Sequence, residues 1–69
     1  MRNKLIETWD YFLKATKNTN SQKMRSKYFD MAYGASVLYS ITYSEVDMFD
    51  EWDPYMMKFL ELIAEATEA

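Results

Sequence analysis

Apolar residues recur at helical spacing in three segments of the chain, and this periodicity limits the fold more than any other feature. In residues 3–17 they stand three and four positions apart, which places them in an arc of about 120° on one side of a helix. Segments from about residue 22 and from residue 54 to about 65 have similar spacing. The pattern predicts an all-α fold, a small three-helix bundle in which residues 1–69 form a single helical domain. The apolar side of the first helix comprises Leu5, Ile6, Trp9, Phe12, Leu13 and Thr16.

Residues that commonly begin helices mark two boundaries. The polar stretch 17–21 predicts the first turn, with Asn20 or Ser21 as the N-cap of the second helix. Asp53 followed by Pro54 predicts the N-cap and first position of the last helix. After that helix, whose last turn carries acidic rather than basic residues, we expect a frayed tail.

A short additional acidic helical turn is predicted before the last helix. Ser44 and Asp47 resemble a capping box in which Asp replaces the usual Glu. The turn reaches Trp52, so the predicted architecture is three helices plus this turn.

Residues 37–43 leave two interpretations open. They alternate with period two and are rich in β-branched and aromatic side chains, which is typical of a strand. Gly34 would then end a shorter helix. A lone strand would need a second molecule to pair with, because no other segment has strand character. We therefore expect these residues to continue the helix.

Composition excludes several classes of function. The chain has no Cys and no His, so it has no thiol nucleophile, no disulfide, no ordinary zinc site and no Ser-His-Asp triad. No apolar run approaches the roughly 20 residues of a membrane span, and the first residues do not resemble a signal peptide. We expect a cytoplasmic protein that is not an enzyme, needs no cofactor and contacts no membrane.

Charge is divided unevenly along the chain. Residues 1–30 carry seven basic and three acidic side chains, whereas residues 31–69 carry one basic and eight acidic ones, and the net charge is −3. Such a chain can neutralise itself on folding, pair with a second copy, or present oppositely charged faces to partners.

Five carboxylates lie within residues 45–53, next to aromatic residue types that are common in interface hot spots. As a calcium loop that starts at Asp47 the segment fails, because Phe49 and Lys58 stand where a ligand and the bidentate Glu belong, so no metal site is expected. Carboxylates on a rigid helix can instead imitate the phosphates of nucleic acid and occupy a basic groove of a protein. The candidate partner-binding residues are Glu45, Asp47, Asp50, Glu51, Trp52, Asp53 and Tyr55.

In size and acidity the chain resembles the short phage-encoded inhibitors of host defence, which include anti-CRISPR and anti-restriction proteins. This resemblance is one of composition, and it carries over no functional positions. It implies a small inhibitor that binds a nucleic-acid-binding protein through its acidic face.

Two alternatives remain. The second and third helices have more apolar surface than a three-helix bundle needs, which is typical of a self-associating structural or regulatory module, a possible homo-oligomer whose acidic face only keeps it soluble. A basic segment around the first turn, including Lys23, Arg25 and Lys27, suggests nucleic-acid binding. The negative net charge argues against direct binding of nucleic acid.

Overall fold

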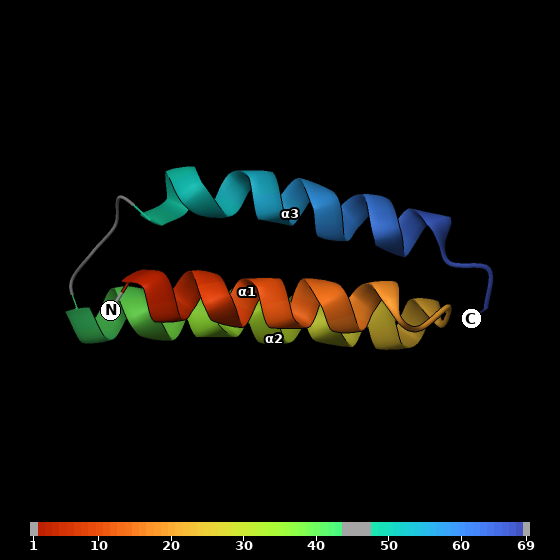
Figure 1. Ribbon diagram of the computed structural model, residues 1–69, viewed down its shortest axis with the longest axis horizontal. Helices are drawn as coiled ribbons and strands as arrows, with labels where there is room; N and C mark the ends of the chain where they lie inside the picture. Colours follow the sequence, from red (N-terminus) through yellow and green to blue (C-terminus); the bar gives the residue numbers. More distant parts are fainter. Residues whose placement is uncertain (1, 44–47, 69) are drawn as a thin grey trace.

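The computed structural model describes residues 2–43 and 48–68, which form an all-α bundle of three helices packed against each other. The helices are α1 (Arg2–Lys17), α2 (Gln22–Tyr43) and α3 (Met48–Glu65). Helices α1 and α2 form an antiparallel pair, and α3 lies along this pair in the same direction as α1 (Figure 1). The predicted three-helix bundle is therefore confirmed, with an elongated shape of 38 × 16 × 15 Å.

The buried core contains residues from all three helices and is rich in aromatic rings. Leu5, Trp9 and Leu13 of α1 are buried, as the helical spacing predicted. They pack with Ala32 of α2 and with Trp52 and Phe59 of α3.

Helix α2 continues through residue 43, so the strand interpretation of residues 37–43 is wrong. Ala32 and Ser36 are fully buried. The Trp9 indole N–H donates a 2.8 Å hydrogen bond to Ser36 Oγ, which fixes this part of α2 against α1. At the other end, Ser21 Oγ accepts a hydrogen bond from the Met24 N–H at 3.2 Å, which identifies Ser21 as the N-cap.

Helix α3 is continuous across residues 53 and 54, so the boundary predicted at Asp53 and Pro54 is wrong. The acidic turn is the beginning of α3 rather than a separate element. Pro54 is the seventh residue of α3, and its missing N–H leaves the carbonyl of Asp50 without the usual intrahelical bond. Burial of Trp52 holds residues 48–53 against the core. The predicted capping residues Ser44 and Asp47 lie outside the described residues.

Residues 66–68 leave the helix but do not fray. They form an isolated parallel bridge with the turn between α1 and α2, joining Ser21 and Glu68. The Gln22 N–H donates to the Glu68 carbonyl at 2.6 Å, and the Glu68 N–H donates to the Asn20 carbonyl at 3.2 Å. The Asn20 side chain also accepts from the Thr67 N–H at 3.2 Å. These bonds hold the segment after α3 against the turn between α1 and α2.

Candidate functional site

The acidic candidate residues lie at the beginning of α3, and the structure places them differently from one another. Asp50 and Asp53 are exposed, whereas Glu51 is half-buried. Glu45 and Asp47 lie outside the described residues. Helical spacing puts Asp50 on the same side of α3 as Glu61, which is also exposed.

This side, with two further exposed carboxylates, forms what we call the acidic face of α3. It is directed away from the core, because the buried Trp52 and Phe59 lie on the opposite side of the helix. The acidic face comprises Asp50, Asp53, Glu61 and Glu65.

Trp52 belongs to the core and not to the exposed face that the sequence predicted for it. Only 2% of its surface is exposed. Its ring stacks on Phe29, with centroids 6.1 Å apart and planes at 15°, and lies 5.2 Å from the ring of Trp9. The reason is the seven-residue spacing between Trp52 and Phe59, which puts both on the buried side of α3.

Tyr55 links α3 to α1. Its hydroxyl donates a 2.7 Å hydrogen bond to Asp10 Oδ1, and its ring lies 5.1 Å from that of Trp9. Lys58 Nζ lies 5.4 Å from the centre of the Tyr55 ring. Desolvation, reinforced by the hydrogen bond and the negative charge of Asp10, raises the pKa of Tyr55 to about 12. Since the hydroxyl proton is already engaged, the main role of this contact is structural.

Arg25 is also a structural residue rather than part of an exposed basic segment. It is 8% exposed. Its Nε donates to the Thr19 carbonyl at 2.7 Å, and a terminal nitrogen donates to the Leu62 carbonyl. The guanidinium therefore joins the first turn to α3, while Lys23 and Lys27 remain exposed.

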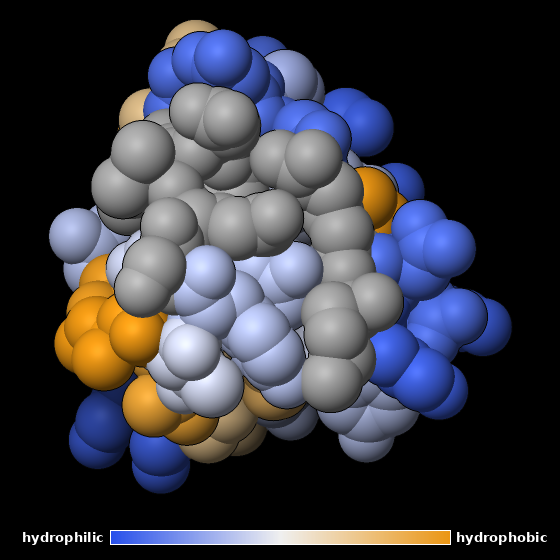
Figure 2. Space-filling view, turned by 90° about the vertical axis from the view of Figure 1, so that its left-hand side faces the viewer, coloured by the Kyte–Doolittle hydropathy of each residue, from blue (hydrophilic) through white to orange (hydrophobic). Residues whose placement is uncertain are grey.

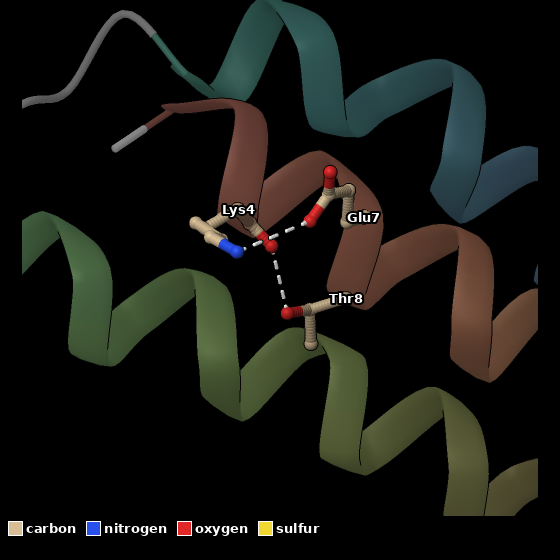
Figure 3. Close-up of polar contacts among 3 residues, drawn as sticks. All are labelled: Lys4, Glu7 and Thr8. Carbon is tan, nitrogen blue, oxygen red and sulfur yellow. Dashed lines mark hydrogen bonds and ion pairs between the residues drawn. The ribbon is translucent and has the colours of Figure 1, made fainter.

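A groove of about 330 Å³ lies between α1 and the C-terminal half of α2, and sequence analysis did not anticipate it. Among the described residues that line it, Lys4 is the only charged one. Its Nζ lies 3.8 Å from Glu7 Oε2, and its carbonyl accepts a 2.8 Å hydrogen bond from Thr8 Oγ1 (Figure 3). The described part of the lining brings no acid and base side chains together. It consists of Lys4, Leu5, Thr8, Ala35, Leu38, Tyr39, Thr42 and Tyr43.

The end of α2 also exposes large apolar side chains. Leu38 is 66% exposed and Ile41 is 72% exposed. Seen from the end where α2 finishes, hydrophobic surface gathers on the lower side of the bundle, where α2 lies (Figure 2). After Gly34, the sequence of α2 is apolar on nearly all sides, and such a helix is normally buried on more than one side.

Comparison with protein-family models, curated proteins and solved structures finds no match to this chain. Among residues 2–43 and 48–68, no group of three or more potential ligands is placed to hold a metal ion. None of the described helices combines the length and apolar character that a membrane crossing requires.

Proposed function

We propose that the chain is a small non-enzymatic protein-binding module that presents the acidic face of α3 to a basic groove of a nucleic-acid-binding protein. The observation that carries the proposal is the placement of four exposed carboxylates along one continuous helix. Asp50 and Glu61 are eleven residues apart, which corresponds to about 16 Å along the helix. A face of this length matches an extended groove better than a single pocket.

Binding at such a face depends on the summed electric field more than on individual ion pairs. An exposed carboxylate paired with Lys or Arg contributes only about 0–1 kcal/mol. Several carboxylates together attract a basic groove over a longer range and speed association, and added salt screens this attraction. The only basic residue in α3 is Lys58, so little on this helix offsets the negative charge.

More specifically, we propose that the chain is an inhibitor of the phage type, with a mode of action like that of anti-CRISPR and anti-restriction proteins. Carboxylates would occupy the groove in place of phosphates, and nucleic acid would be displaced. Such an inhibitor would bind its target stoichiometrically and would carry out no reaction on it.

The test compares two triple variants that change the net charge equally. The face variant replaces Asp50, Asp53 and Glu61 with Lys. The control replaces three carboxylates elsewhere with Lys, namely Glu7, Asp30 and Glu68. Circular dichroism first establishes that both variants keep the helix content of the wild type.

Each protein is then immobilised and exposed to lysate, and any captured protein is purified and bound to labelled DNA or RNA. We expect wild type and control to capture the same protein and to displace its nucleic acid, and the face variant to do neither. Equal capture by both variants, or capture without displacement, would contradict the proposed function.

A further inference from the structure

One side of α2 lies away from both other helices, and in its C-terminal half this side is apolar. The exposed residues on this side are three or four positions apart in the sequence and fall within an arc of about 80° around the helix. Residues 31–43 contain no charged side chain at all. We call this side the outer face of α2; it comprises Lys23, Lys27, Met31, Gly34, Leu38 and Ile41, all exposed.

Gly34 stands in the middle of this face, and nothing in the described chain requires a glycine there. A Cβ added at Gly34 would meet no atom of the described residues within 4 Å, and its backbone is not in the left-handed region. Glycine inside a helix costs about 1 kcal/mol relative to Ala. What glycine offers in return is close approach of a second backbone, which points to a helix from outside the bundle.

We propose that the outer face of α2 pairs with the same face of a second copy, antiparallel, with the two helices crossing at Gly34. In this register the sum of facing residue numbers is 68, so Lys27 of each copy faces Ile41 of the other. The two Gly34 residues meet on the twofold axis, and Met31 of each copy lies beside Leu38 of the other. The interface is therefore self-complementary, as a twofold dimer requires.

Charge favours the antiparallel orientation. A parallel pair would place Lys23 and Lys27 against the same residues of the other copy. In the antiparallel pair, Lys27 instead lies near the uncharged C-terminal half of α2 in the other copy.

The length of the outer face of α2 also fits a dimer. A stable dimer commonly buries about 800 Å² on each partner. This is about one sixth of the 4669 Å² surface of the chain, so it requires one whole side of the bundle. The 22 residues of α2 extend for about 33 Å, nearly the full 38 Å of the molecule. Pairing along all of α2 therefore uses a surface of the necessary length.

The first experiment measures solution mass by light scattering over a dilution series of the full chain. We expect the wild type to approach twice 8.3 kDa at high concentration. The double variant Met31→Glu/Leu38→Glu should weaken the dimer about 30-fold or more, since it places negative charges beside each other at the apolar centre of the interface. Met31 is 43% exposed and Leu38 is 66% exposed, so the variant should keep the helix content of the wild type.

Met57→Glu is the matched control, because Met57 is 55% exposed on α3 and lies outside the proposed interface. It should leave the dimer intact. A wild type that stays at 8.3 kDa up to millimolar concentration overturns the proposal. A dimer that the double variant does not weaken overturns it as well, because the seam then lies elsewhere.

The second experiment tests the register, and the absence of natural cysteines makes it straightforward. A Lys27→Cys chain is mixed with an Ile41→Cys chain under mild oxidation. Disulfides form only where Cα atoms come within about 7 Å. We expect the mixed pair to cross-link and Lys27→Cys alone to remain unlinked. Self-linking of Lys27→Cys would refute the antiparallel arrangement. Neither experiment depends on the acidic face, so this inference and the proposed function can fail separately.

Discussion

The two buried tryptophans differ in hydrogen bonding, and this difference predicts a difference in their contributions to stability. The Trp9 N–H donates to Ser36 Oγ at 2.8 Å. Within the described residues, the buried Trp52 N–H has no acceptor. Both rings are at least 98% buried and contact each other. Replacing each with Phe removes a similar volume from the same core.

The expected changes in the free energy of unfolding follow from the hydrogen bonding of the two indole N–H groups. Trp9→Phe loses a hydrogen bond with a net contribution of about 1 kcal/mol, in addition to the packing loss. Trp52→Phe has a comparable packing loss but removes an unsatisfied buried donor, whose desolvation costs about 1–3 kcal/mol. Trp9→Phe should therefore be more destabilising than Trp52→Phe by about 2 kcal/mol. For a chain of this length, this corresponds to roughly 10 °C in Tm.

The assay is thermal and urea unfolding followed by circular dichroism, with all variants at one protein concentration so that self-association does not confound the comparison. Ser36→Ala is the companion variant, because it leaves the Trp9 N–H without its acceptor and should cost about 1–3 kcal/mol. The double variant with Trp9→Phe should cost less than the two single changes together. If Trp52→Phe proves as destabilising as Trp9→Phe, the reasoning from unsatisfied donors is refuted.

Three further variants test individual contacts. Arg25→Met should lower the free energy of unfolding by about 2 kcal/mol, and Arg25→Lys should restore little, because a single ammonium cannot replace a guanidinium that bonds two carbonyls. A raised pKa of Tyr55 means that the unfolded state loses this proton first, so the contribution present below pH 10 is lost between pH 10 and about 12. Urea unfolding at pH 9 and pH 11 should therefore show a smaller loss in Tyr55→Phe than in wild type, with Tyr11→Phe, 70% exposed, as the wild-type-like control. Asn20→Ala removes two hydrogen bonds to Thr67 and should speed amide exchange at Thr67 about fivefold; unchanged exchange would mean that the tail is held by other contacts.

Local features of the fold could be predicted from the sequence because they depend on neighbouring residues. The apolar side of α1 follows from spacing alone, and cap chemistry left Asn20 or Ser21 as the N-cap of α2, of which the structure shows Ser21. The predicted helix start at Pro54 was wrong because Asp followed by Pro is compatible with the first position of a helix and also with a position within its early turns. The choice between them depends on the burial of Trp52, which is a tertiary contact.

The exposure of the candidate residues was predicted in part, and their binding of a partner stays a prediction. Exposure of Asp50 and Asp53 agrees with the prediction, and the seven-residue spacing of Trp52 and Phe59 could have assigned Trp52 to the core. The bond between Tyr55 and Asp10 joins residues 45 apart, so no local pattern indicates it. The exposed side of α2 escaped prediction because a helix that is apolar all round does not indicate which side its two neighbours will leave uncovered.

The contacts of Arg25 and the tail have a consequence for how the bundle unfolds. The guanidinium spans the turn before α2 and the last turn of α3, and residues 66–68 bond to the same turn. Detaching α3 would break the bond to the Leu62 carbonyl, release the bridge at the same moment and expose the core residues of α1 and α2 that Trp52 and Phe59 cover. The hairpin of α1 and α2 is therefore not an independent cooperative unit. Loss of any helix should melt the other two, so probes on different helices should report a single transition.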